Sequence, residues 1–183
     1  MGCDKALLRV GSRRLIECAI ERIRPHVQRV IVLGNARNRA PFARLPVDGV
    51  LTDFKPDYGP LMGVYTGLMQ SPTLLNLFIP CDMPWVDARV IDRLLNGLEP
   101  DLDVMASRGP DGRVYPFPLL CRLRACRTIG ALLDRRALSL HELLRHPQAR
   151  LLTIHEPELL RGFMNVNTLD DALQLHDEPI VAR

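Results

Sequence analysis

The hydrophobic residues near the start of the chain follow two different spacings in succession. Apolar side chains recur three or four positions apart over 15–27, which predicts an amphipathic helix with Ser12 as its N-cap. The β-branched run at 29–33 comes next and stops at Gly34-Asn35, as a buried parallel strand does. A helix followed by a buried strand is the repeating unit of α/β folds.

The same alternation continues through the middle of the chain. Short apolar runs at 49–52 and 74–79 predict two further strands, and Gly59-Pro60 between them predicts the start of a helix. A second helix is predicted at 86–98. Strands that alternate with helices through short connections usually pair in parallel, with helices on both faces of the sheet. The pattern therefore predicts a three-layer, doubly wound α/β fold.

The pattern changes after a further apolar run at 102–106. The turn signal Gly109-Pro-Asp-Gly112 separates this run from 114–120, which predicts an antiparallel hairpin and a mixed, mostly parallel sheet. The remaining predicted elements are helices at 122–134, 140–144 and 170–176 and a strand at 151–154. A chain of 183 residues, 47% of them hydrophobic, suits one domain, and no linker or repeat interrupts it.

Charge and cysteine content narrow the classes of partner and compartment. The 24 basic and 21 acidic residues give a formal charge of +3, which favours a small anionic substrate over a nucleic acid. Seven arginines crowd into 122–150, either as a solvated helix face or as a surface for a phosphate or a partner. The five cysteines form no C-x-x-C pair, and no apolar run is long enough for a membrane span, so we expect a cytoplasmic protein.

Polar residues that follow predicted strands are the first candidates for chemistry, because ligands of open parallel sheets bind beyond the carboxyl ends of the strands. Asp82 follows the strand predicted at 74–79, in the segment Phe78-Ile-Pro-Cys-Asp-Met-Pro84, and a carboxylate in this place suits a magnesium ion (Mg2+) that bridges nucleotide phosphates. The alternative is that Asp82 caps the helix that begins near Val86.

Five further candidates each have a structural alternative. Asp53 ends its strand before a glycine-containing loop, and it could equally be a turn carboxylate. Asn35 could bind a base or sugar edge, although Gly-Asn also forms turns. Asn165 and Asn167 face the same side of an extended segment, as amides of an ordered loop also would. Lys5 is isolated near the N-terminus, where most lysines are only solvated.

No other reaction class gathers comparable support. The five histidines have no metal-binding spacing, and the sequence contains neither a serine nucleophile elbow nor a cysteine in a catalytic context. The sequence therefore argues against a hydrolase and against a metalloprotease.

Four segments together resemble the ordered motif set of the molybdenum cofactor guanylyltransferases. They are Met1-Gly-Cys-Asp-Lys-Ala-Leu-Leu8, Thr52-Asp53 with Gly59-Pro-Leu-Met-Gly63, Pro80-Cys-Asp-Met-Pro84 and Phe163-Met-Asn-Val-Asn-Thr168. The match runs through nearly the whole chain in the right order. The Cys-Asp-Met-Pro and Asn-Val-Asn-Thr forms look more like the guanylyl-transferring branch than the related cytidylyl-transferring branch.

The resemblance implies a nucleotide-diphospho-sugar transferase type of α/β fold and transfer of GMP from GTP to Mo-molybdopterin. The products would be molybdopterin guanine dinucleotide and pyrophosphate, and molybdoenzyme chaperones or apoenzymes would be partners. Cytidylyl transfer, or nucleotidyl transfer to another phosphorylated acceptor, is the enzymatic alternative. The resemblance implies that Lys5 contacts the nucleotide phosphates and that Asn35 and Asp53 contact the guanine nucleoside. It also implies that Asp82 binds Mg2+ and that Asn165 and Asn167 lie on the acceptor side.

The chain departs from this family at its start. The family opens with a strand and a glycine-rich loop of the form Leu-Ala-Gly-Gly, and this sequence begins inside the end of that segment, at Met1-Gly2. We therefore expect 1–183 to be a single domain that is N-terminally truncated relative to the family. One hypothesis is that the native protein is longer, which the intact later motifs favour. The other is a relative that binds the cofactor or its acceptor enzyme without turnover.

Overall fold

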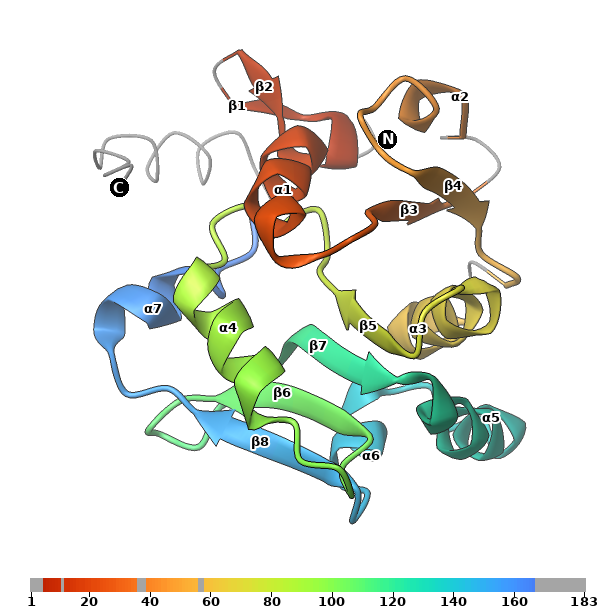
Figure 1. The fold of residues 1–183 in the computed structure, drawn as a ribbon, viewed down its shortest axis with the longest axis vertical. Helices are drawn as coiled ribbons and strands as arrows, with labels where there is room; N and C mark the ends of the chain where they lie inside the picture. The colour runs from red at the N-terminus through yellow and green to blue at the C-terminus, as the bar shows by residue number, and fades with distance from the viewer. Residues whose placement is uncertain (1–4, 11, 36–38, 56–57, 167–183) are drawn as a thin grey trace.

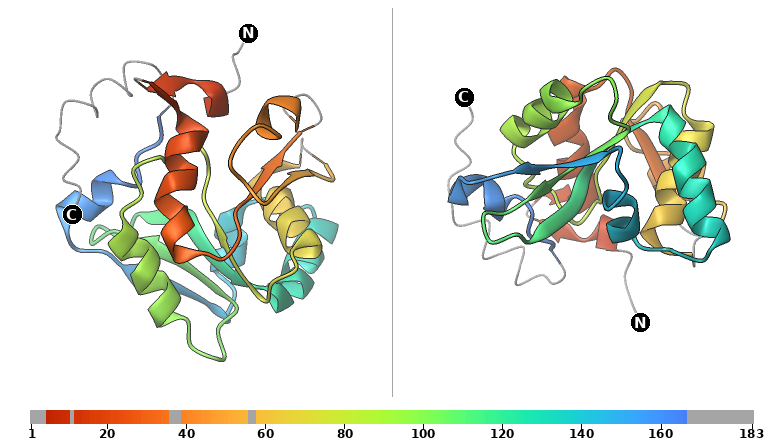
Figure 2. Two further views of the ribbon diagram at one scale, coloured as in Figure 1. Left: turned by 45° about the horizontal axis from the view of Figure 1, so that its top comes forward. Right: turned by 90° about the horizontal axis from the view of Figure 1, so that it is seen from below.

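The computed structural model describes residues 5–10, 12–35, 39–55 and 58–166. Helices and strands alternate along the chain, and the strands form a central layer with helices on both sides (Figure 1). Helices α1 and α4 lie on one side of this layer, and α3 and α5 lie on the other (Figure 2). The three-layer α/β fold predicted from the sequence is confirmed.

The N-terminal part of the structure contains one long helix and a pair of parallel strands. Its elements are η1 (Lys5–Leu7), β1 (Arg9–Val10), β2 (Arg13–Arg14), α1 (Leu15–Ile23), η2 (Arg24–His26), β3 (Ile31–Gly34), α2 (Arg39–Phe42) and β4 (Gly49–Thr52). Strands β3 and β4 pair in parallel, with Ile31 opposite Gly49 and Gly34 opposite Thr52. Buried Ile16 and Ile20 of α1 pack against this pair.

The start of α1 differs from the sequence prediction. The helix begins at Leu15, and the Glu17 side chain accepts a hydrogen bond from the Arg14 backbone N–H at 2.7 Å. Ser12 is not the N-cap, because it lies in the connection between β1 and β2, where its carbonyl oxygen accepts from Arg9 Nη2 at 2.7 Å. The short hairpin therefore takes the place of the predicted cap.

The C-terminal part contains a mixed four-stranded sheet in the order β5-β7-β6-β8. Its elements are α3 (Gly59–Gln70), β5 (Leu75–Phe78), α4 (Ala88–Gly97), β6 (Val104–Arg108), β7 (Val114–Arg122), η3 (Leu123–Ala125), α5 (Cys126–Asp134), α6 (Leu140–Leu144), β8 (Ala149–Thr153) and α7 (Pro157–Arg161). The predicted hairpin is confirmed as β6 and β7. Strand β7 lies antiparallel between β5 and β6, whereas β6 and β8 are parallel.

Two element boundaries after β7 differ from prediction. The helix expected at 122–134 begins only at Cys126, because β7 continues to Arg122 and a 3-10 turn follows it. Strand β8 starts at Ala149, two positions before the predicted start, and pairs with Val104 there. The helix predicted at 170–176 lies outside the described residues.

The four-stranded sheet buries both of its faces. Val104 and Ala106 point to a core shared with α3, α5 and α6, while Met105 points to a second core shared with α4 and α7. Strand β7 alternates in the same way, with Leu119 in the first core and Leu120 in the second. This alternation explains why the strand sequences read as continuous apolar runs.

A slot separates β3 from β5, so the two sheets do not join. It is a cavity of about 790 Å³ whose walls include β3, β5, α1 and α3.

Candidate active site

The carboxyl ends of β3 and β5 lie at the same edge, beside the start of α3. A Cβ added at Gly63, near the start of α3, would lie 3.4 Å from Leu33 at the end of β3. At the other end of α3, Ser71 hydrogen-bonds Asn76 at the start of β5. Helix α3 is therefore antiparallel to both strands, and β3 and β5 run parallel across the slot. Ligands of such sheets bind at this carboxyl edge.

Asn35 and Asp53 are neighbours at this edge. Asn35 follows the last residue of β3, and the carbonyl oxygen of that residue, Gly34, accepts from the Asp53 backbone N–H at 2.9 Å. Asp53 in turn follows β4. The sequence placed both residues at strand ends, and the parallel register of β3 and β4 brings them side by side.

A buried hydroxyl fixes the orientation of the Asp53 carboxylate. Thr66 of α3 is fully buried and donates to Asp53 Oδ1 at 2.9 Å, while its own oxygen accepts from the Phe54 backbone N–H at 3.2 Å. The Lys55 backbone N–H also donates to Oδ1, at 3.2 Å. The other oxygen, Oδ2, lies near Gly63 of the same helix, where an added Cβ would be 3.7 Å from it.

Thr66 is a functional candidate that sequence reasoning missed. It lies within the apolar pattern of α3 and looks like a core position of that helix. Only its distance to Asp53 shows what the hydroxyl does, so the sequence carries no separate signal for it.

The first turn of α3 offers backbone N–H groups near the same edge. The helix has 12 residues, its N-cap Tyr58 makes no side-chain capping hydrogen bond, and Gly59 has a φ of +70° that favours glycine. Pro60 and Gly63 of this helix line the slot together with Asp82. Unpaired N–H groups and the positive end of the helix dipole favour an anionic ligand at such a place.

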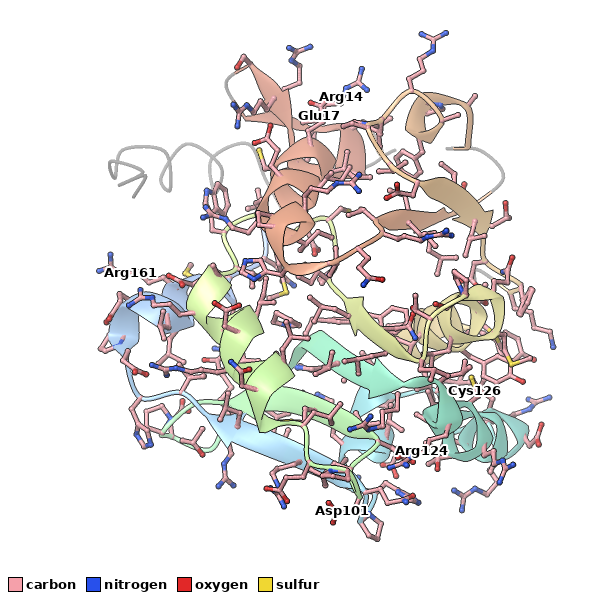
Figure 3. All side chains as sticks on the ribbon, viewed as in Figure 1. Arg14, Glu17, Asp101, Arg124, Cys126 and Arg161 are labelled. Atoms are coloured by element: carbon pink, nitrogen blue, oxygen red, sulfur yellow. The ribbon has the colours of Figure 1, made fainter. Side chains whose placement is uncertain are left out.

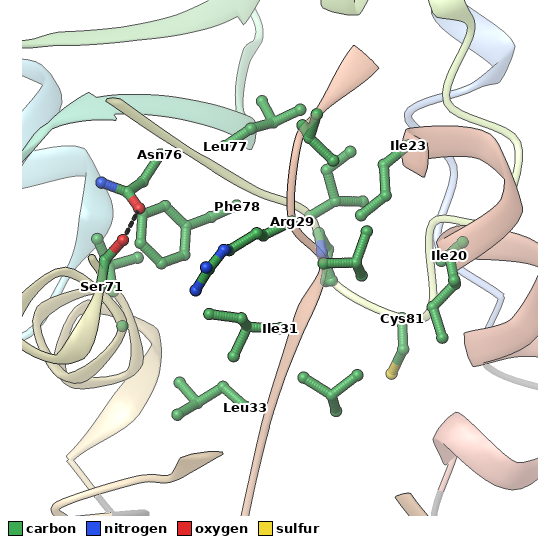
Figure 4. Close-up of a pocket in the computed structure, with 18 of the residues that line it drawn as sticks. Ile20, Ile23, Arg29, Ile31, Leu33, Ser71, Asn76, Leu77, Phe78 and Cys81 are labelled. Carbon is green, nitrogen blue, oxygen red and sulfur yellow. Dashed lines mark hydrogen bonds between the residues drawn. The ribbon is translucent and has the colours of Figure 1, made fainter. Parts of the chain in front are cut away.

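Asp82 lies across the slot from Asn35 and Asp53. Its side chain is half-buried and lines the slot, whose walls are shown in Figure 4. The capping role considered for Asp82 is wrong, because α4 begins at Ala88 and Asp87 is its N-cap, accepting from the Arg89 backbone N–H at 2.8 Å. The Asp82 carboxylate is therefore not committed to the helix.

The segment before residue 167 returns to Asp82. The Val166 backbone N–H donates to the Asp82 carbonyl oxygen at 2.8 Å, and Val166 packs against Leu15 at the start of α1. Asn165 is exposed beside this contact. Asn167 lies outside the described residues, and Lys5 begins η1, although its side chain is outside the description.

Ion pairs hold α7, and with it the returning segment, against α4. Arg93 of α4 donates to Glu156, the N-cap of α7, at 2.6 Å. The Arg93 guanidinium lowers the pKa of Glu156 to about 2. Arg89 likewise lowers the pKa of Asp87 and lies 3.8 Å from Glu158. The Arg93–Glu156 pair joins α4 to the helix that precedes Asn165, and the sequence motifs gave no sign of it.

The arginine-rich stretch 122–150 is mostly exposed, but three of its arginines bind the 98–103 loop, away from this edge. Arg122 donates to the carbonyl oxygens of Leu98, Glu99 and Leu102. Arg124 pairs with the buried carboxylate of Asp103, and Arg150 pairs with Glu99. Figure 3 shows Arg124 at the opposite end of the molecule from Arg14 and Glu17 at the start of α1. These arginines fasten the 98–103 loop to the sheet.

The described residues contain no cluster of three or more His, Cys, Asp or Glu side chains that could hold a metal ion. Within the same ranges, no helix has the length and apolar character needed to cross a membrane. Two carboxylates follow strands at this edge: Asp82 lines the slot, and Asp53 follows β4, on the far side of β3 from the slot. Mg2+ commonly binds one or two carboxylates together with substrate phosphates, and this donor set fits that mode.

Known proteins resemble this chain in both sequence and fold. The chain is 27% identical over 174 residues to the molybdenum cofactor guanylyltransferase of Vibrio parahaemolyticus, covering 94% of this chain and 86% of that protein. It is 29% identical over 178 residues to the protein of the same name from Shewanella sediminis, with 96% and 88% covered. The fold matches molybdopterin-guanine dinucleotide biosynthesis protein A from Archaeoglobus fulgidus at a TM-score of 0.73, 18% identity and 94% and 89% coverage.

Residues 1–151 match the family model of the MobA-like NTP transferase domain. This match contains Asn35, Asp53, Thr66 and Asp82, so the whole edge except Asn165 falls inside it. The chain belongs to the family of MobA-like NTP transferase domains.

Proposed function

We propose that this protein transfers GMP from GTP to Mo-molybdopterin, forming molybdopterin guanine dinucleotide and releasing pyrophosphate. The observation that supports the proposal most directly is the position of Asn35, Asp53 and Asp82 after β3, β4 and β5, at the carboxyl edge beside the start of α3. Relatives from Vibrio parahaemolyticus and Shewanella sediminis, named as guanylyltransferases, support the choice of nucleotide and acceptor.

Asn35 and Asp53 are assigned to the guanine nucleoside. Their polar atoms lie on neighbouring strands, so they can contact one rigid ligand at two points. The Asp53 carboxylate is held by Thr66 before any ligand arrives, which lowers the entropy lost on binding. A site that hydrogen-bonds one base leaves unpaired polar groups with another base and so discriminates between them.

The phosphate chemistry is assigned to the region between α3 and Asp82. Attack of a phosphate on a triphosphate needs alignment and charge neutralisation more than a covalent protein intermediate. Asp82 is assigned as the Mg2+ ligand, and the metal would neutralise phosphate charge when bound. We also assign Lys5 to the nucleotide phosphates, and Asn165 and Asn167 to the acceptor, on the strength of the motif match.

The decisive experiment compares Asp82→Asn with Asp87→Asn in the protein isolated from its source. Pyrophosphate release is measured with GTP and a molybdopterin acceptor. Asp82→Asn should lower kcat about 100-fold or more, since it weakens binding of the Mg2+ ion that neutralises charge at the reacting phosphates. Asp87→Asn removes a nearby carboxylate that caps α4 and should leave kcat unchanged. Equal activity of Asp82→Asn and wild type would refute the assignment.

Parallel titrations with GTP and CTP test the choice of nucleotide. A clear preference for GTP that weakens in Asp53→Asn, through KM rather than kcat, supports the base-contacting role. A preference for CTP would place the chain with the cytidylyl-transferring alternative. We propose a cytoplasmic setting in which the product passes to molybdoenzyme apoenzymes or their chaperones, and pull-down with those proteins tests the partner assignment.

A further inference from the structure

The turn between β6 and β7 projects from the same edge of the sheet as Asp82. Strand β7 is antiparallel to both β5 and β6, so β5 and β6 run in the same direction and their carboxyl ends share one edge. Strand β6 ends at Arg108, and residues 109–113 form the turn that follows it. Figure 1 shows this turn on the same side of the molecule as α7. The turn therefore lies at the edge that carries the proposed site.

The backbone of this turn holds Arg113 in a defined place. The Gly109 N–H donates to the Arg113 carbonyl oxygen at 2.8 Å, and the Arg113 N–H donates to Asp111 Oδ1 at 3.0 Å. Gly112 has a φ of +82°, a conformation that favours glycine. The Arg113 side chain is exposed, and its guanidinium forms no ion pair with a carboxylate of the described residues.

An aromatic ring keeps the Arg113 guanidinium in position. Its Cζ atom lies 5.4 Å from the centre of the Tyr115 ring. The face of an aromatic ring attracts a cation at this distance, and the contact leaves the N–H donors of the guanidinium available for a ligand. Arg113 and Tyr115 are two positions apart, so both point to the face of the sheet that packs against α4 and α7.

The same tyrosine supports the segment that carries Asn165. The rings of Tyr115 and Phe163 stack with their centres 4.4 Å apart and an angle of 22° between their planes. Phe163 is buried and lies two residues before Asn165. Because one ring contacts both Arg113 and Phe163, the guanidinium and the Asn165 segment are held by a common support.

The 162–166 segment is also fixed against the residues around Asp82. A Cβ added at Gly162 would lie only 2.7 Å from the Trp85 carbonyl oxygen, so the two backbones are in close contact. The Val166 N–H donates to the Asp82 carbonyl oxygen at 2.8 Å. The turn between β6 and β7 is therefore connected, through the stacked rings, to the backbone of Asp82.

We propose that Arg113 binds the acceptor by contacting an anionic group of that molecule, and that Tyr115 positions the guanidinium for this contact. The proposal rests on the function proposed above, which requires a phosphorylated acceptor. A guanidinium suits such a ligand because its N–H donors match the oxygens of a phosphate in pairs. Asn165, which is assigned to the acceptor, lies on the segment that Tyr115 supports, so both residues reach the same molecule.

Arg108 offers a matched control on the other face of the same hairpin. It is exposed like Arg113, but it lies opposite Val114 and Thr153 and donates to Thr153 Oγ1 at 2.9 Å. Val114 packs against the first core, so Arg108 points to the face that is covered by α3, α5 and α6. Substitution of either arginine by glutamine removes one positive charge from the same end of the hairpin.

The test measures turnover with GTP and a molybdopterin acceptor. Arg113→Gln should raise KM for the acceptor about tenfold or more and leave kcat and KM for GTP within about twofold, because only acceptor binding loses a charge-assisted contact. Arg108→Gln should change none of these constants. An unchanged acceptor KM in Arg113→Gln, or an equal rise in both variants, would overturn the proposal.

Direct titration with the acceptor separates this proposal from the proposed function. A wild-type protein that binds the acceptor without turnover contradicts the proposed function, and the dissociation constants of the two arginine variants then decide the role of Arg113 by the same comparison. A wild-type protein that does not bind the acceptor refutes both.

Variants of Tyr115 test the positioning role. Tyr115→Leu removes the ring and should raise KM for the acceptor, whereas Tyr115→Phe keeps the ring and should restore the wild-type value. The effect of Arg113→Gln should be smaller in the Tyr115→Leu background, because the guanidinium is no longer held there. Tyr65→Leu replaces a half-buried tyrosine on the opposite face and should leave KM for the acceptor unchanged. Equal effects of Arg113→Gln in both backgrounds would overturn the role of Tyr115.

Discussion

The four-stranded sheet and the two-stranded β3–β4 pair are built from similar apolar runs but are buried to different degrees. Four of the five residues of β6 are buried, whereas every residue of β4 is only partly buried and Ile31 of β3 is exposed. The number of neighbouring strands differs: among the residues that the structure describes, β6 has a strand on each side, and β3 has one. A continuous apolar run indicates a strand that needs two neighbours, and only the four-stranded sheet supplies them within the described residues.

Matched leucine truncations should show the largest difference between the regions. Leu120 is fully buried in β7, and Leu120→Ala should cost about 3–5 kcal/mol through lost burial and a new cavity. Leu33 borders the slot, and Leu33→Ala in the 183-residue chain should cost only about 1 kcal/mol because its site is already open. Urea unfolding monitors both, and equal costs would show that the slot is packed in solution.

Thr66 lies between the two regions and should show a smaller effect on stability together with an effect on binding. Thr66→Val removes the donor to Asp53 and the acceptor for Phe54 in a fully buried site, at a cost of about 1–3 kcal/mol. The freed carboxylate should also raise the KM for the nucleotide. Thr66→Ser keeps the hydroxyl and serves as the control, and a Val variant with unchanged KM would argue against the positioning role.

Acidification should weaken the four-stranded region through α7. The Arg93 guanidinium lowers the pKa of Glu156 from 4.5 to about 2. A carboxyl group with a lowered folded pKa stabilises the native state above pH 4.5, and this contribution is lost as the pH falls toward 2. Glu156→Gln should flatten the stability curve over that interval and leave it unchanged in shape above it. Chemical unfolding at a series of pH values measures this, and an unaltered curve would contradict the role of the pair.

A substitution at Ser107 should change the free energy of unfolding least, and it tests the packing of the four-stranded sheet. Its hydroxyl is buried in β6, and among the described residues it has no hydrogen-bond partner. Ser107→Ala removes an unsatisfied polar atom, so the free energy of unfolding should stay level or rise by about 1 kcal/mol. A loss of stability would mean that the hydroxyl is satisfied in solution.

Several features of the site were predictable because they depend on local sequence. Asn35, Asp53 and Asp82 could be found as polar residues after apolar runs, and parallel strands end at a common edge. The position of Asp82 alone did not distinguish a ligand from a helix cap. That distinction required the start of α4, where Asp87 takes the capping role three residues after Pro84.

The alternation of helices and strands, the β6–β7 hairpin and the strand-end residues were predictable from the sequence alone, because these features follow from periodicity and turn chemistry within short segments. The order β5-β7-β6-β8, the bond between Thr66 and Asp53, the bonds of Arg122 and Arg124 to the 98–103 loop, and the slot between β3 and β5 became visible only in three dimensions. Those features join residues far apart in the chain, and a pattern along the sequence carries no distance between such residues.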